Sequence, residues 1–472
     1  METSNHLKTG RSRKAKRVGK TLKNITMLHH QLVPFSVQSS WVPNPNRESF
    51  RLFFEMVLKA KPQALSPSIQ ALKELIEGDT VLTFLANNAF QQNGNIIEAH
   101  QATKDVPIPR IPDLETLLHA FNTILSMAPQ YINDDLVGLP FSALVVGIDA
   151  TLGGSTLFRL PMFNEKMKAI LNEWAIFLDT PSSASGFTID GKQWLSPTAK
   201  HQYEFDLWEK DSPTLPYWRS WDSFFTRKFL DSAKSRPIAS PETNQVVICP
   251  NDGSLFCWQP QVKRKDVFWL KDMPYSLEDI FSSSVPEEDA TIKQYKLAEM
   301  FEGGYVFQTY LNPYNFHRWW VPVNGEVLFD PIVIPGCFFS KVVLPDYGGA
   351  TTASTPYLAE ANARGLVVFK TEDYGYVCCI PLGMSEVSTV QFDEGIKQGA
   401  KVNKGDEMGM FHYGGSSFVV IYQNLPDKQL IFMDGDGNYY PQQPPPPGSS
   451  AGASNYNTNI GSQIGQWYSK CE

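Results

Sequence analysis

The feature that most constrains this chain is a change in the spacing of its apolar residues near residue 246. Before that point apolar side chains recur every three or four residues, as in Phe50–Leu58 and Leu114–Ile124, which is the period of an amphipathic helix. After it, short β-branched and aromatic runs such as Tyr305–Tyr310 and Phe418–Tyr422 alternate with glycine, proline and aspartate, which is typical of strands. The sequence therefore predicts an α+β fold, with a helical N-terminal domain followed by a β-rich domain.

Composition divides the chain further. Residues 1–40 form a basic segment that we expect to be a disordered tail, residues 41–200 the helical domain and residues 201–432 the β-rich domain. Residues 433–472 are rich in proline, glycine, serine and asparagine, and we expect a second disordered tail there. Whether the basic tail is a solvated arm, a targeting signal or a membrane-surface segment stays open.

Two segments of the β-rich domain, Val321–Val327 and Glu394–Asp406, are similar to the hammerhead barrel of biotinyl and lipoyl carriers. Their glycines and the Asn-Gly pair suit tight turns between short strands. We therefore expect barrel-sandwich elements in this domain. A swinging-arm carrier is not expected, because no lysine occupies the tip of the hairpin.

Charge and cysteine usage exclude several classes of function. Lysine and arginine number 41 against 49 acidic residues, so a broad basic surface for nucleic acid is not expected. The six cysteines form no CxxC pair and no zinc-like spacing with histidine, so we expect no metal. No run approaches the ~18 apolar residues of a membrane span, and no signal peptide is visible, which together favour a cytoplasmic protein.

The segment Met410–Phe418 carries the strongest chemical signal. Glycine allows the strained backbone that a Gly-Ser bond needs to cleave itself, and the Ser416 hydroxyl can attack the carbonyl of Gly415. Elimination and hydrolysis then leave a pyruvoyl group, and Ser417 is a candidate for holding the developing oxyanion. A second Gly-Gly-Ser, Gly153–Ser155, lacks this context and is interpreted as a turn between helices.

The context around Ser416 resembles the phosphatidylserine decarboxylase family of pyruvoyl enzymes over roughly 200 residues. The matching blocks keep their order and spacing, and they are Trp221–Arg227 followed by Arg236–Pro237, Pro250–Gly253, Tyr275–Leu277, Tyr310–Arg318, Val321–Gly325, Pro335–Gly336, Asn362 with Arg364, and Gly415–Ser417. The helical N-terminal domain, the His-Arg-Trp segment and Gly409–Ser417 are similar to the soluble fungal branch that contains tryptophan decarboxylases.

The resemblance implies a pyruvoyl-dependent carboxy-lyase acting on a free L-amino acid, with an aromatic, tryptophan-like side chain as the first expectation. Its cofactor is pyruvate derived from Ser416, without pyridoxal phosphate or metal, and it forms a Schiff base with the substrate amine. Chains 1–415 and 416–472 are expected to stay associated after cleavage. Membrane contact is not favoured.

Departures from the family pattern leave the base for cleavage open. The aspartate of the family's protease-like triad is Asn315 here, a further family histidine is Trp320, and the histidine expected between Gly336 and Asn362 is absent. His317 and His412 are the candidate catalytic histidines, and Asp346, Glu386 or a water are further alternatives for the proton acceptor. His317 is the first candidate for returning a proton to the α-carbon or for binding the substrate.

Substrate contacts are expected from residues near the two histidines. Arg318 is a candidate partner for the substrate carboxylate, and aromatic walls suit an indole or phenol ring. The candidate substrate-binding residues are Asn315, Phe316, Arg318, Trp320 and Tyr413.

Two other functions remain. A phosphatidylserine decarboxylase that makes phosphatidylethanolamine would fit the same motifs, and the basic tail favours it. A protein that never cleaves itself, because the aspartate and histidine are lost, would serve as a binding or scaffold protein.

Overall fold

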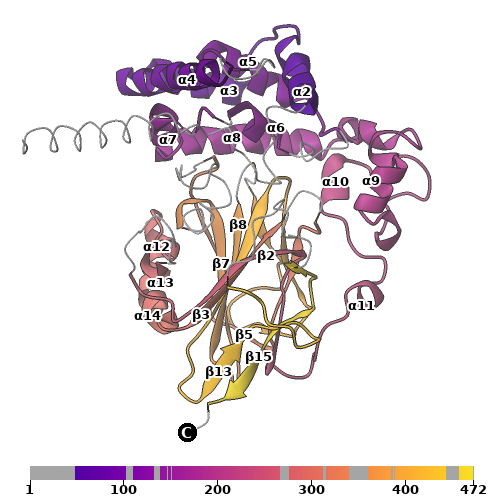
Figure 1. The fold of residues 1–472 in the computed structure, drawn as a ribbon, viewed down its shortest axis with the longest axis vertical. Helices are drawn as coiled ribbons and strands as arrows, with labels where there is room; N and C mark the ends of the chain where they lie inside the picture. Colours follow the sequence, from indigo (N-terminus) through magenta and orange to yellow (C-terminus); the bar gives the residue numbers. More distant parts are fainter. Residues whose placement is uncertain are drawn as a thin grey trace, which may run out of the picture.

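The helices between residues 48 and 178, called the helical part below, lie across one end of a β-sheet structure (Figure 1). The computed structural model describes residues 48–101, 110–131, 139–145, 147–149, 151–265, 276–311, 315–339, 360–383, 386, 389–442 and 456–470. The mixture of helix and sheet confirms the predicted α+β class. The expected N-terminal tail, residues 1–40, and the alternative base Asp346 lie outside the described residues.

Helices dominate up to residue 235. Their bounds are α2 (Glu48–Leu58), α3 (Pro67–Glu77), α4 (Thr80–Gln101), α5 (Leu114–Ile124), α6 (Pro140–Val145), α7 (Leu152–Leu157), α8 (Pro161–Leu178), α9 (Pro197–Gln202), α10 (Trp221–Phe225) and α11 (Ser232–Ser235), with 3₁₀ turns η1 (Pro181–Phe187), η2 (Gln193–Leu195) and η3 (Phe205–Leu207).

Local sequence explains several of these helices. Ser66 caps α3 by accepting a hydrogen bond from the backbone of Ile69, and Pro67 occupies the first turn, where its missing N–H costs nothing. Asp113 caps α5 in the same way through Thr116. The second Gly-Gly-Ser, Gly153–Ser155, lies inside α7 and not in a turn between helices.

The largest sheet has nine antiparallel strands in the order β10-β5-β7-β8-β12-β3-β2-β14, with β6 also paired to β7. Two three-stranded sheets, β4-β11-β9 and β1-β15-β13, complete the β structure. The strand bounds are β1 (Val246–Ile248), β2 (Gly253–Pro260), β3 (Tyr305–Leu311), β4 (Arg318–Trp320), β5 (Gly325–Val327), β6 (Ile332–Ile334), β7 (Arg364–Lys370), β8 (Tyr376–Gly383), β9 (Val390–Phe392), β10 (Lys401–Val402), β11 (Glu407–Phe411), β12 (Ser416–Tyr422), β13 (Lys428–Ile431), β14 (Asn457–Thr458) and β15 (Gln463–Ser469).

Strand β12 buries both of its faces. Val419 and Ile421 face the core covered by helices α12 (Leu277–Ile280), α13 (Pro286–Tyr295) and α14 (Leu297–Phe301), which lie beside the sheet in Figure 1. Phe418 and Val420 face the opposite core, which the smaller sheets cover. Because alternate side chains enter two different cores, the sequence of β12 is a continuous run of mostly apolar residues.

One prediction about the β region needs correction, and a second is not confirmed. The expected disordered tail at 433–472 contains β14 and β15, and β15 pairs with both β1 and β13. The physical reason is that Ile464 and Trp467 are both buried in one core, because a bulge in the pairing of β15 with β1 lets residues three positions apart reach the same side. The hammerhead barrel is not confirmed, because the described strands form open sheets.

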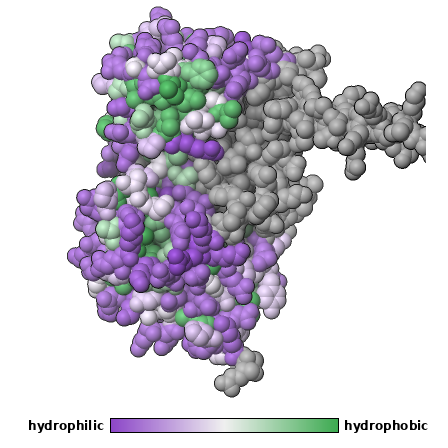
Figure 2. All heavy atoms as spheres, turned by 90° about the vertical axis from the view of Figure 1, so that its left-hand side faces the viewer, coloured by the Kyte–Doolittle hydropathy of each residue, from purple (hydrophilic) through white to green (hydrophobic). Residues whose placement is uncertain are grey.

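On the face that Figure 2 shows, exposed apolar residues gather mainly over the helical part. Helices α4 and α7 pack together and expose Val81, Phe84 and Leu152. Among the residues that the structure describes, no helix is both long enough and apolar enough to cross a membrane.

Candidate active site

Ser416 stands where a loop becomes the central strand of the large sheet. It is the first residue of β12, its register partners are Leu311 of β3 and Gly383 of β8, and its side chain is 1% exposed. Gly414, two residues earlier, has a φ of 147°, a conformation that residues with a side chain rarely adopt. The Gly415–Ser416 bond therefore joins a glycine-dependent loop to a strand that is held on both sides.

His317 is the histidine that reaches this serine. Its Nδ1 lies 3.3 Å from Ser416 Oγ, and its side chain is fully buried. The ring packs on that of Phe225, with centroids 4.2 Å apart, and the backbone carbonyl of His317 accepts a hydrogen bond from the N–H of Phe411 at 3.0 Å. With its proton on Nε2, the imidazole can accept the hydroxyl proton of Ser416 at Nδ1.

His412 is directed to other partners. Its Nδ1 lies 2.8 Å from Asp222 Oδ1, and its Nε2 lies 2.9 Å from Gln391 Oε1. Both ring nitrogens are thus engaged, although His412 is only four residues from Ser416. The structure joins Ser416 to His317 and places His412 in a contact between β11's end and helix α10.

The Ser417 side chain lies on the opposite face of β12 from Ser416, as alternation along a strand requires. Its hydroxyl donates to the carbonyl of Thr309 at 2.6 Å and accepts from Gln308 Nε2 at 2.9 Å. The structure therefore does not bring this hydroxyl together with that of Ser416, and Ser417 instead ties β12 to β3.

Arg318 is held by protein groups. Its Nε donates to the carbonyl of Thr226 at 2.7 Å, and its guanidinium forms an ion pair with Glu407. Burial lowers the pKa of Arg318, while nearby carboxylates, with Asp222 first, act in the opposite direction. Its neighbour in the motif, Asn315, accepts a hydrogen bond at its backbone carbonyl from Arg227.

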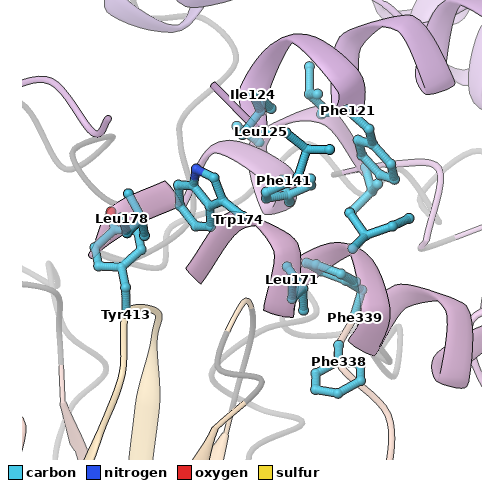
Figure 3. Close-up of a cluster of buried hydrophobic side chains, with 14 of the residues drawn as sticks. Phe121, Ile124, Leu125, Phe141, Leu171, Trp174, Leu178, Phe338, Phe339 and Tyr413 are labelled. Atoms are coloured by element: carbon cyan, nitrogen blue, oxygen red, sulfur yellow. The ribbon is translucent and has the colours of Figure 1, made fainter. Parts of the chain in front are cut away.

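The candidate aromatic residues fall into two groups. Phe316 and Trp320 pack with Phe229, and Phe316 also stacks on Trp208. Tyr413 instead projects from the β part into the helical part, where it lies beside Trp174 (Figure 3).

The Tyr413 ring also contacts Phe225, with centroids 5.0 Å apart, and Phe225 is the ring that packs on His317. Of the three aromatic candidates, Tyr413 is therefore the one linked to the Ser416–His317 pair.

Sequence reasoning missed two residues at this site. The ring of Phe225 packs on His317, and Asn362 donates from Nδ2 at 2.9 Å to the carbonyl of Gly383, which is the register partner of Ser416 in β8. Both residues belong to blocks that carry the family resemblance. The sequence therefore marked their positions but did not indicate what either side chain does. Within the described part of the chain, no group of three or more histidine, cysteine or acidic residues is placed to hold a metal ion.

Comparison with known proteins identifies the family. Two family models, both described as phosphatidylserine decarboxylase, match residues 221–436 and 66–203. The chain is 36% identical over 310 residues to decarboxylase iboD of Amanita muscaria, which covers 60% of this chain and 84% of that protein. The chain belongs to the phosphatidylserine decarboxylase family.

Other relatives show where in the phosphatidylserine decarboxylase family the chain lies. An L-tryptophan decarboxylase of Psilocybe cubensis is 26% identical over 383 residues, covering 75% of this chain and 80% of that protein. A phosphatidylserine decarboxylase proenzyme of Fusobacterium nucleatum is 26% identical over 233 residues, covering 49% and 69%. These relatives confirm the resemblance to the family and to its fungal branch, and the protein is a decarboxylase, a carboxy-lyase, of a pyruvoyl-dependent family.

Proposed function

We propose that this protein cleaves its own Gly415–Ser416 bond and then decarboxylates an L-amino acid with an aromatic side chain. The observation that carries the proposal is the 3.3 Å approach of His317 Nδ1 to Ser416 Oγ, at the point where a glycine-dependent loop enters β12. The roles of the individual residues are part of the proposal.

Self-cleavage is a sequence of steps on Ser416 itself. His317 accepts the hydroxyl proton, and Oγ attacks the carbonyl carbon of Gly415, so that the peptide C–N bond breaks and an ester forms while the released nitrogen takes up a proton. Loss of the α-proton of Ser416 expels the Gly415 carboxylate and leaves dehydroalanine. Addition of water and loss of ammonia convert this residue to a pyruvoyl group.

The site suits a pyruvoyl group, because this group would form from the atoms of Ser416, which is buried beside the buried His317. The pyruvoyl group supplies an electron sink for loss of CO₂ from an amine-bearing substrate, without pyridoxal phosphate. His317 holds a proton next to the same atoms and is our candidate for returning it to the α-carbon.

The aromatic preference rests on two observations. Relatives from Psilocybe cubensis and Psilocybe cyanescens are named L-tryptophan decarboxylases. In this chain the ring of Phe225 packs on His317 and also contacts the ring of Tyr413. Aromatic surfaces of this kind suit an indole or phenol ring. A free amino acid requires no lipid surface, and we therefore also propose a cytoplasmic location.

The test compares intact masses of the purified protein, the Ser416→Ala variant and the Ser155→Ala variant. Ser155 also follows two glycines, but it lies in helix α7, so it is a matched control. We expect fragments 1–415 and 416–472, with a blocked N-terminus on the second, in the wild type and in Ser155→Ala, and one intact chain in Ser416→Ala. Cleavage that persisted in Ser416→Ala would overturn the assignment.

The substrate is tested with the cleaved protein. CO₂ release is measured from L-tryptophan, L-tyrosine, L-phenylalanine and L-leucine, and separately from phosphatidylserine vesicles. Preference for the aromatic amino acids supports the proposal. Turnover of phosphatidylserine alone would make the protein a lipid decarboxylase, and an uncleaved, inactive wild type would leave a binding or scaffold protein.

A further inference from the structure

A continuous series of packed rings runs from the helical part to Ser416. Trp174 of helix α8 contacts Tyr413 with ring centroids 5.1 Å apart, Tyr413 contacts Phe225 at 5.0 Å, and Phe225 packs on His317 at 4.2 Å. His317 Nδ1 then lies 3.3 Å from Ser416 Oγ. Figure 3 shows Tyr413 reaching up from the end of the β structure to meet Trp174.

Trp174 is itself fixed in place. Its side chain is 2% exposed, and its Nε1 donates to the backbone carbonyl of Met127 at 3.0 Å. Its ring also packs edge-on against Phe141. Because the indole is held on several sides, it presents a fixed surface to Tyr413 and does not adapt to it.

Two further contacts from the helical part reach the same end of the sheet. Asn164 of α8 accepts a hydrogen bond at Oδ1 from the backbone of Phe338 at 3.1 Å. Glu386, three residues after Gly383, accepts one from the backbone of Ser142 at 2.8 Å. The helical part therefore contacts the loops at this end of the sheet at three places, which are Tyr413, Phe338 and Glu386.

The loop before the scissile bond needs such external support. Gly414 and Gly415 have no side chains, so they cannot fix their own position by packing. Tyr413 is the last residue before them with a side chain, and it is 5% exposed. Attack of Ser416 on the Gly415 carbonyl depends on the placement of that carbonyl, and a misplacement of about 1 Å costs about 100-fold in rate.

We infer that Trp174 is a positioning residue for self-cleavage, and that the helical part sets the geometry of the Gly415–Ser416 bond by holding Tyr413 against Phe225 and His317. Trp174 does not touch the reacting atoms and acts through Tyr413. The inference rests on the proposed function, because it concerns the same cleavage.

The test measures the rate of cleavage of freshly made precursor by intact mass for Trp174→Ala, Trp174→Phe and Leu72→Ala. Leu72 is 1% exposed in helix α3 and belongs to the same helical core, so it is a control for loss of packing alone. Thermal unfolding of each precursor is measured in a Ser416→Ala background. We expect Trp174→Ala to cleave about 10- to 100-fold more slowly, Trp174→Phe to recover most of the rate, and Leu72→Ala to cleave like the wild type at temperatures where it is folded.

Two additional measurements keep the test decisive. Tyr413→Leu removes the same contact from the β side, and the Trp174→Ala/Tyr413→Leu double variant should be no slower than Tyr413→Leu alone, since both changes break one interaction. Hydroxylamine cleaves the ester that forms when Ser416 attacks Gly415. If Trp174→Ala slows that attack, no ester accumulates, and hydroxylamine should not restore the rate of chain cleavage.

Trp174→Ala cleaving at the wild-type rate, or slowing only in proportion to its lost stability as Leu72→Ala does, would overturn the inference and leave the proposed function intact. Strictly additive effects of the two substitutions would do the same. Failure of the wild type to cleave at all would instead overturn the proposed function, and the inference with it.

Discussion

At the scale of single residues, the proton of the Ser416 hydroxyl needs an acceptor, and His317 is in contact with it at 3.3 Å. We expect His317→Ala to slow self-cleavage by about 10²- to 10⁴-fold, because general-base help of this kind is lost. The measurement is a time course of intact mass. His412→Ala is the control, since His412 is bound to Asp222 and Gln391. Slower cleavage in His412→Ala than in His317→Ala would contradict the prediction and make His412 the base.

Glu360 gives a prediction about pH and stability. Burial raises its pKa from 4.5 to about 8, although the N–H of Ser276, which donates to its carboxylate at 2.9 Å, acts in the opposite direction. The folded protein thus holds a proton that the unfolded chain releases from about pH 4.5 upwards, so the stability of the fold decreases as the pH rises from about 4.5 to about 8.

Glu360→Gln removes this titration. We expect the free energy of unfolding, measured by denaturant titration at several pH values, to fall less between pH 5 and pH 8 than in the wild type, with the variant the more stable protein at pH 8. Glu372→Gln, at an exposed position, should follow the wild-type curve. Equal pH dependence in all three proteins would contradict the prediction.

The residues of the site differ in how far the sequence reveals them. Ser416 is found from the order of the motifs around it, and His317 from its place in one of them. The partner of His412 could not be found in this way, because Asp222 lies 190 residues earlier in the chain and nothing local links them. The same distance problem hides Phe225 as the ring beside His317.

At the scale of elements, β15 shows where composition misleads. The chain around it is rich in polar and small residues, yet Trp467 is 2% exposed and its ring contacts those of Tyr305 and Tyr422. We expect Trp467→Ala to lower the free energy of unfolding by about 3–5 kcal/mol, because it leaves a large cavity. Tyr468→Ala, on the more exposed face of the same strand, should cost much less, and comparable losses in denaturant titrations would contradict this placement.

Helices and strands were predictable where the local pattern is complete. Helix α3 has its cap, its first-turn proline and an apolar face in one short stretch, so sequence suffices to find it. The hammerhead prediction is not confirmed. Asn-Gly and glycine turns specify hairpins, whereas closure of a barrel depends on pairing between strands that are distant in sequence.

At the scale of the whole molecule, the proposed cut falls at the start of β12, a strand that is buried along its whole length and paired on both sides. Fragment 416–472 would begin with β12, which pairs along Ser416–Tyr422 with β3 on one side and β8 on the other. Later in the same fragment β15 pairs with β1, and β14 pairs with β2. Each of these partner strands belongs to fragment 1–415, so the two fragments share one sheet system and its cores.

Separation of the fragments would therefore expose both faces of β12 and break its hydrogen bonds to two neighbours, which amounts to unfolding the β structure. We expect the cleaved protein to elute from a sizing column as one species in native buffer, with both masses in the peak, and the fragments to separate only in denaturant. The Ser416→Ala protein provides the elution position of the uncut chain. A small fragment eluting alone in native buffer would show that β12 is held less firmly than its pairing on both sides requires.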